Sequence, residues 1–216
     1  MKKLFIFVIC AIVALSTAAA VSAGELKTSD TMLDFLETIG IIHTETDAPE
    51  DDVTREVFAV YVARMLGINE TGESGTRYFV DLENNAFSQY SVNALAERGI
   101  IAVPEDRYFR PGEGISYEEA VKMLVCALGY EKYAEYRGGY PQGYLATAEA
   151  LKISCTVQDR AQLKVSEAAE LVYKTLVAPV CAMDITDGIA TIFESEDSLL
   201  AQQFDIQWQE GTVTKI

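Results

Sequence analysis

The chain has 216 residues, and half of them are hydrophobic, which suffices for one or two domains with a buried core. Lys and Arg number 17 against 33 Asp and Glu, so the formal net charge is −16 at pH 7. This balance argues against nucleic acid as a partner, because phosphate binding needs a basic face. An anionic ligand would have to be held by a few local cations.

The first 23 residues have the pattern of a secretory signal peptide. Lys2 and Lys3 precede an apolar run from Leu4 to Ala20, and the small residues of Val21-Ser22-Ala23 fit a cleavage site. No later run is long and apolar enough to span a membrane. We therefore expect an exported protein with no stable membrane insertion after the signal is cleaved.

The stretch from Thr31 to Ile68 predicts two helices joined by a loop. Apolar residues recur at helical spacing from Met32 to Ile39, and Gly40 ends this first helix before the short extended pair Ile41-Ile42. An acidic loop follows. The second helix has Thr54 at its N-cap and Gly67 just past its last turn.

The same order of elements recurs twice along the chain. In the second copy, Ser88 can cap a helix that stops at Gly99, and another helix follows Ser116. In the third copy, Lys152-Ile153 takes the place of the Gly-Ile pair, and the last helix follows Lys164. Such recurrence is typical of a repeat architecture, in which one unit cannot bury its apolar faces alone. The sequence therefore predicts a mostly α fold, a three-repeat helical bundle.

The tail, residues 182–216, has a different composition. Ile189–Phe193 and Phe204–Val213 are rich in β-branched and aromatic residues, and Trp208 is the only tryptophan. This composition predicts two or three short strands, a β-rich C-terminal extension. It could be a cap on the bundle or the start of a further domain.

Catalytic and metal-binding patterns are weak. After signal cleavage Cys126, Cys155 and Cys181 remain, which is neither a disulfide framework nor a zinc motif, although a Cys155–Cys181 bridge stays open. His43 is the only histidine, and the acidic loops lack the spacing of a calcium-binding EF-hand loop. No nucleophile elbow or phosphate loop is present, and no carboxylate pair stands out for glycoside hydrolysis. We expect no enzyme activity, no cofactor and no metal.

Several short motifs resemble those of the S-layer homology family of bacterial cell-surface proteins. The matching segments are Val53-Thr54-Arg55-Glu56, Phe79-Val80-Asp81-Leu82, Gly99-Ile100-Ile101 and Phe109-Arg110-Pro111, with Phe87 where the family has a tryptophan. The chain also departs from the family. The arginine of the opening motif survives only as Arg55, since Tyr117 and Val165 take its place in the other copies. The motif's glutamate is kept as Glu119 and Glu167, but the first copy has Val57.

The resemblance implies a module of three repeats, residues 31–68, 79–130 and 140–180, within a domain of residues 24–181 that has pseudo-threefold symmetry. In the family, such modules bind secondary cell-wall polymer linked to peptidoglycan, without covalent attachment, at the surface of Gram-positive-type bacteria. The polymer's acidic sugar lies in grooves between repeats and contacts the motif arginine. By match, we expect one good groove at most. The implied polymer-binding residues are Thr54, Arg55, Asp81, Phe87, Ser116, Tyr117 and Glu119.

The same residues also have ordinary structural interpretations. Thr54 and Ser116 can cap their helices, and Ser116 with Glu119 forms a capping box. Arg55 opposes the helix dipole, so it needs either an ion pair, with Glu119 or Asp81, or an anionic ligand held together with free helix N–H groups.

Aromatic residues such as Tyr140 and Tyr144 could stack on sugar rings or could line the core. The alternative function is a degenerate module that acts as a structural or protein-interaction domain without binding glycan. The loss of the motif arginine in two of the three copies favours it.

Overall fold

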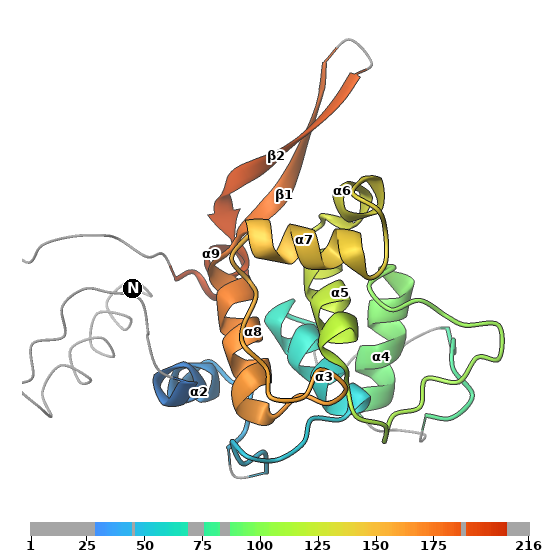
Figure 1. Ribbon diagram of the computed structural model, residues 1–216, viewed down its shortest axis with the longest axis vertical. Coiled ribbons are helices and arrows are strands. Elements are labelled where there is room, and N and C mark those ends of the chain that lie inside the picture. The colour runs from blue at the N-terminus through green and yellow to red at the C-terminus, as the bar shows by residue number, and fades with distance from the viewer. Residues whose placement is uncertain (1–28, 45, 69–75, 83–86, 187–188, 207–216) are drawn as a thin grey trace, which may run out of the picture. The chain divides into compact units, whose positions relative to one another are not determined.

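The computed structural model describes residues 29–44, 46–68, 76–82, 87–186 and 189–206 (Figure 1). The predicted signal peptide and the segment around Trp208 lie outside these residues. The fold is mostly α, as predicted, with one small sheet. Its elements are α2 (Ser29–Thr38), α3 (Arg55–Met65), α4 (Phe87–Glu97), α5 (Tyr117–Ala127), α6 (Glu131–Tyr136), α7 (Gln142–Ala150), α8 (Val165–Val177), β1 (Pro179–Thr186), β2 (Ile189–Ser198) and α9 (Leu199–Phe204). Within the described ranges, no helix combines the length and apolar character needed to cross a membrane.

Helices α2, α4 and α7 end in the same way. A residue with positive φ follows each helix, namely Gly40 (76°), Gly99 (76°) and Lys152 (59°). The next amide then donates to the carbonyl five residues back, as Ile41 does to Leu36, Ile100 to Leu95 and Ile153 to Ala148, each at 2.9 Å. This Schellman arrangement satisfies carbonyls that a helix end leaves free. Lys152 therefore adopts the conformation of the two glycines, as the sequence predicted.

Helices α3, α5 and α8 have Thr54, Ser116 and Lys164 at their N-cap positions. The Thr54 hydroxyl accepts from the Val57 amide at 3.3 Å, and the Ser116 hydroxyl accepts from the Glu119 amide at 3.2 Å. Both predicted caps are confirmed. The predicted cap at Ser88 is wrong, because α4 already begins at Phe87 and Ser88 lies inside its first turn.

Three buried backbone positions, one just before each of these helix starts, form a closed ring of hydrogen bonds. The Val53 amide donates to Leu163 O at 2.8 Å, the Leu163 amide to Ile115 O at 3.1 Å, and the Ile115 amide to Val53 O at 3.0 Å. All three side chains are fully buried. The ring joins segments that are far apart in sequence and satisfies buried polar groups that would otherwise destabilise the core.

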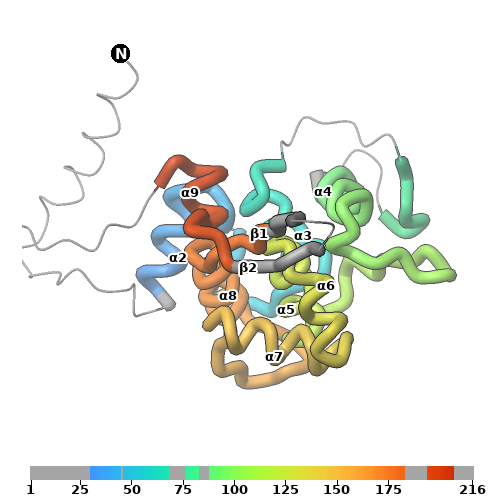
Figure 2. The backbone as a smooth tube through the Cα atoms, turned by 90° about the horizontal axis from the view of Figure 1, so that it is seen from above, coloured from blue at the N-terminus to red at the C-terminus, as the bar shows by residue number. Residues whose placement is uncertain are grey.

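The helices pack in pairs that connect one predicted repeat to another. Helix α4 packs on α3, α7 packs on α5, and α2, the first described helix, packs on α8 (Figures 1 and 2). The pairing is therefore cyclic, with the α2–α8 contact closing it. Pseudo-threefold symmetry is what such a pairing would produce, and it stays a prediction. Side chains at the centre of the paired helices are fully buried, among them Leu36, Phe58, Leu95, Leu124 and Leu171.

The predicted β-rich extension is confirmed in part, because the predicted strand Ile189–Phe193 lies within β2. The first strand, β1, begins at Pro179, inside the predicted third repeat, and pairs antiparallel with β2, from Pro179↔Ser198 to Thr186↔Ile189. Figure 1 shows this hairpin extending away from the end of α8. The Cys181 amide donates to Leu128 O at 2.8 Å, which ties the start of β1 to the end of α5.

A further strand is predicted from Phe204, and the described chain forms a short helix just before it, with Phe204 as the last helical residue. Ser198 caps α9 by accepting from the Ala201 amide at 3.3 Å, and Leu199 and Leu200 are buried. Burial of these two leucines against α8 favours a helix over a continued strand, and α9 ends at Phe204. The remainder of the predicted strand lies outside the described residues. Cys126, Cys155 and Cys181 are free thiols, so the Cys155–Cys181 bridge does not form.

Candidate functional site

A groove of about 230 Å³ lies where the start of α3, the chain after α4, the first turns of α5 and the segment before α7 meet. Its lining residues are Arg55, Ile100, Ile101, Ala102, Glu119, Lys122, Met123 and Tyr140. These residues come from all three predicted repeats. The cyclic packing of the helices therefore brings together side chains that the sequence keeps far apart.

Arg55 is held on one wall of this groove by contacts with the second predicted repeat. Its Nη1 forms an ion pair with Glu119 Oε1, and its Nε donates to Phe109 O at 2.9 Å. The guanidinium also lies over the Phe109 ring, 5.0 Å from the centroid. The side chain is 18% exposed. Of the two interpretations of this arginine, the ion pair with Glu119 is confirmed.

The N–H groups at the start of α3 are already occupied. The Arg55 amide donates to Glu113 O at 2.8 Å and the Glu56 amide to Pro111 O at 3.2 Å. The loop before α5 crosses the start of α3 and supplies both carbonyls. The idea that these N–H groups hold an anion together with the arginine is therefore wrong, because backbone carbonyls have taken the place of a ligand.

Glu119 uses both carboxylate oxygens. Oε1 binds Arg55, while Oε2 accepts from the Ser116 amide at 3.1 Å and from the Ser116 hydroxyl at 3.0 Å. The predicted capping box is thus confirmed, and it has a second role. The same carboxylate that caps α5 fixes the guanidinium at the start of α3.

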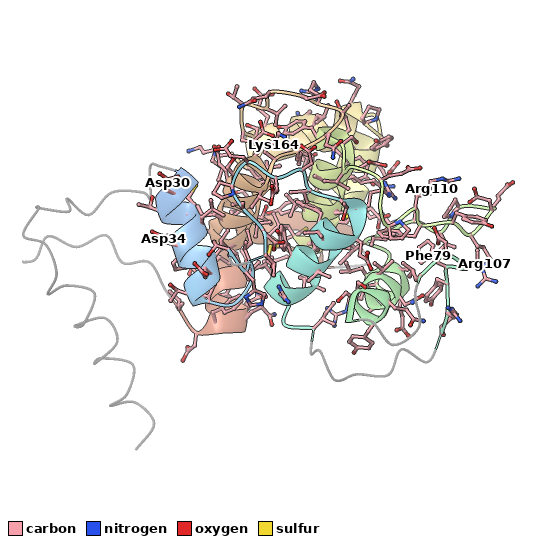
Figure 3. The ribbon with its side chains drawn as sticks, turned by 90° about the horizontal axis from the view of Figure 1, so that it is seen from below. Asp30, Asp34, Phe79, Arg107, Arg110 and Lys164 are labelled. Carbon is pink, nitrogen blue, oxygen red and sulfur yellow. The ribbon has the colours of Figure 1, made fainter. Side chains whose placement is uncertain are left out.

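Asp81 does not contact Arg55, so the alternative ion pair between these two residues is wrong. Its carboxylate instead accepts from the amides of Phe109 and Arg110 at 2.8 and 2.6 Å. The Phe109 ring packs on the buried Phe79 ring with 5.4 Å between centroids. Figure 3 shows Phe79, Arg107 and Arg110 on one side of the described fold and Asp30 and Asp34 of α2 on the other. Asp81 therefore fixes the loop whose carbonyl receives Arg55.

The two positions that lack the motif arginine are buried. The guanidinium carbon of Arg160 lies 4.7 Å from the centroid of the Tyr117 ring. Burial raises the pKa of the Tyr117 hydroxyl. Arg160 also pairs with Glu118 at 2.6 Å. In the third copy, Val165 is buried, and the Glu167 carboxylate accepts from the Gln158 amide at 2.7 Å. The second and third copies therefore supply no arginine at the motif position.

Of the seven predicted site residues, the structure brings Arg55 and Glu119 into the groove lining. Thr54 and Ser116 cap helices, Asp81 holds a loop, and Tyr117 is buried against Arg160. Phe87 begins α4, and its side chain lies outside the described residues. Within the described part of the chain, no cluster of His, Cys, Asp and Glu could hold a metal ion.

Sequence reasoning missed Lys122 as a site residue, and it left the role of Tyr140 open. Lys122 Nζ lies 5.5 Å from the centroid of Tyr140 and 5.9 Å from that of Tyr144. The available indication was spacing. Lys122 follows Glu119 by three residues on α5, so both side chains lie on one face of that helix. Tyr140 is 51% exposed, so part of its ring is open to a ligand in the groove.

Comparison with known proteins shows which family the chain resembles. Residues 78–121 match the family model of the S-layer homology domain. This segment is therefore similar to an S-layer homology domain. The match spans α4, the loop held by Asp81 and the first turn of α5, which is the segment that provides one wall of the groove.

Three relatives extend this likeness beyond the domain match. The chain is 27% identical over 168 residues to a surface layer protein of Brevibacillus choshinensis, which covers 71% of this chain and 15% of that protein. It is 25% identical over 172 residues to the middle cell wall protein of Brevibacillus brevis, with 73% and 16% covered. It is 32% identical over 117 residues to an endoglucanase of a Bacillus species, with 54% and 12% covered. The chain thus spans about a sixth or less of the length of these relatives.

Proposed function

We propose that this chain is a non-enzymatic cell-surface module that anchors to the cell wall by binding secondary cell-wall polymer linked to peptidoglycan. The S-layer homology match supports this function, as do a relative named as a surface layer protein and another named as a cell wall protein. The endoglucanase aligns over only 12% of its length, so its name gives little support for catalysis in this chain.

The observation that carries the proposal is the composition of the groove. It combines two cations, Arg55 and Lys122, with the exposed ring of Tyr140 and an apolar floor, in a chain whose net charge is −16. An acidic polysaccharide presents carboxylates and weakly polar sugar faces, which match these two kinds of surface. Thr54, Ser116, Asp81 and Tyr117 would support the walls of the site through the contacts described above, and a contribution from Phe87 stays a prediction.

Co-sedimentation with purified Gram-positive-type cell walls tests the proposal. We expect the protein to pellet with intact walls and to stay in the supernatant once acid extraction has removed the secondary polymer. Retention on extracted walls would point to bare peptidoglycan and contradict polymer binding. A buffer-only incubation of the same walls controls for losses during handling.

The second candidate is a structural or protein-interaction module that binds no glycan. It is favoured by one observation: Tyr117 and Val165 occupy two of the three arginine positions, and the remaining Arg55 is already paired with Glu119. Under this alternative, the protein would pellet with neither wall preparation.

A further inference from the structure

The two cations in the groove differ in what they already bind. Arg55 is engaged through Nη1, through Nε and through its guanidinium face, as described above. The structure gives Lys122 no hydrogen bond and no ion pair within the described residues, and its ammonium lies near the rings of Tyr140 and Tyr144. Lys122 is half-buried, so its three N–H donors face a groove that is partly shielded from solvent.

A ligand carboxylate that approached Arg55 would have to compete with Glu119. Displacing Glu119 would leave a second carboxylate in the same groove, and repulsion between like charges opposes that. It would also disturb the capping box, because the other oxygen of Glu119 holds the Ser116 amide. A ligand that bound Lys122 would displace no carboxylate of the protein.

Tyr140 provides a surface for the neutral part of such a ligand. Half of its side chain is exposed, and Lys122 lies over its ring, so ammonium and aromatic ring are next to each other at the groove. Ile100, Ile101 and Met123 form a buried apolar floor beside them. A sugar ring resting against Tyr140 would place a carboxylate substituent within reach of Lys122.

We infer that Lys122 is the residue that contacts the anionic group of an acidic saccharide in this groove, with Tyr140 against the sugar ring. Arg55 is a positioning residue that orients Glu119 and the loop carrying Phe109. This inference rests on the proposed function for the identity of the polymer. It adds the charge requirement of the ligand and the residue that meets it.

The test uses two forms of one probe. The first is secondary polymer released from purified walls by acid extraction, and the second is the same polymer after its carboxylates have been converted to methylamides with methylamine and a carbodiimide. Affinities of the wild type and the variants Lys122→Gln, Lys122→Arg and Arg55→Gln are measured for both forms by calorimetry. Lys132→Gln serves as the matched control, because Lys132 is exposed on α6 and removing it changes the net charge equally.

We expect Lys122→Gln to bind the acidic polymer about tenfold more weakly than the wild type, since a hydrogen bond to a charged group is lost. Lys122→Arg should restore most of the affinity, and Lys132→Gln should match the wild type. On the amidated polymer, wild type and Lys122→Gln should bind equally. Arg55→Gln should weaken binding to both polymers by the same factor, because a positioning residue does not contact the carboxylate itself.

Two results would overturn the inference. One is that Lys122→Gln binds the acidic polymer as tightly as the wild type. The other is that the preference for acidic over amidated polymer disappears in Arg55→Gln but persists in Lys122→Gln. In both cases wild-type binding remains, so the proposed function stands. If the wild type binds neither polymer, the proposed function fails and the inference fails with it. Unfolding curves of each variant show whether a loss of binding reflects a loss of fold.

Discussion

At the scale of single residues, the carboxylate of Glu119 connects the starts of two helices through Arg55, which lies 64 positions away along the chain. It completes the cap of α5 and holds Arg55 at the start of α3. The sequence predicted both contacts as separate possibilities, because a capping box is a local pattern and an Arg–Glu pair is a common use of arginine. It could not predict that one carboxylate serves both, since that depends on the α3–α5 packing.

Replacing the two N-cap residues by alanine should have unequal effects. Ser116→Ala removes the hydroxyl that binds both the Glu119 amide and the Glu119 carboxylate, whereas Thr54→Ala removes one longer bond to Val57. We expect Ser116→Ala to lower the free energy of unfolding by about 1–2 kcal/mol and Thr54→Ala by about 0.5–1 kcal/mol. Urea denaturation measures both values. An equal or reversed order would contradict this account of Glu119.

The thiols of Cys126 and Cys155 should react slowly in the folded protein. Burial raises the pKa of Cys126 to about 11 and that of Cys155 to about 12, so at pH 8 the reactive thiolate is scarcer than in an unfolded chain. We expect alkylation by iodoacetamide at pH 8 to be at least about tenfold slower without urea than in 8 M urea, because a higher pKa lowers the fraction of thiolate. Peptide mass spectrometry measures the modification of each cysteine. Equal rates in both conditions would show that these thiols are exposed.

At the scale of elements, the sequence predicted helix ends better than helix beginnings. Gly40, Gly99 and Lys152 mark equivalent ends because a positive φ is required there and glycine supplies it without strain. The prediction of Ser88 as an N-cap was wrong because the preceding residue, Phe87, is already helical. Helix α6 was missed because its six residues offer too little periodicity, and the hairpin start at Pro179 was missed because α8 runs almost directly into β1.

Substitutions at two of the positive-φ positions, Lys152 and Gly99, should change the free energy of unfolding in opposite directions. Lys152→Gly should stabilise the protein by about 1 kcal/mol, because an L-residue in the left-handed region is strained. Gly99→Ala should destabilise it by about 1 kcal/mol for the same reason, since no atom lies within 4 Å of the added Cβ. Thermal and urea unfolding measure both changes.

Gly112→Ala is the control for this pair, because Gly112 has equal open space around an added Cβ but does not have positive φ. It should change stability by less than about 0.5 kcal/mol. A loss of stability as large as that of Gly99→Ala would mean that backbone strain does not explain the effect.

At the scale of the whole described fold, the ring formed by Val53, Ile115 and Leu163 joins the three helix starts. The recurrence of motifs predicted three similar units, but not that carbonyls of one loop would occupy the helix N–H groups of the next. That arrangement arises from contacts between residues more than forty positions apart, which no local pattern encodes. For the same reason the sequence identified Arg55 but not Lys122, whose partners Tyr140 and Tyr144 are supplied by a neighbouring helix and its preceding segment.

Hydrogen exchange should identify this ring as part of the most stable core. The amides of Val53, Ile115 and Leu163 should exchange only when the whole fold opens, although all three precede helices and lie in loop segments. The Val80 amide, which donates to Arg107 O in an exposed loop, should exchange orders of magnitude faster. Nuclear magnetic resonance measures both classes. Exchange of the ring amides at the rate of Val80 would show that the ring opens locally.

The contact between α2 and α8 also has a consequence for folding during synthesis. Helix α2 ends at Thr38, and its packing partner begins at Val165. At about 5–20 residues per second, the ribosome needs roughly 6–25 s to make the intervening chain, and Leu33 and Leu36 have no partner on α8 in that time. The nascent chain therefore cannot complete this helix packing until α8 has been made. Export through a secretion channel, which the predicted signal peptide implies, would use the chain in this incompletely folded form.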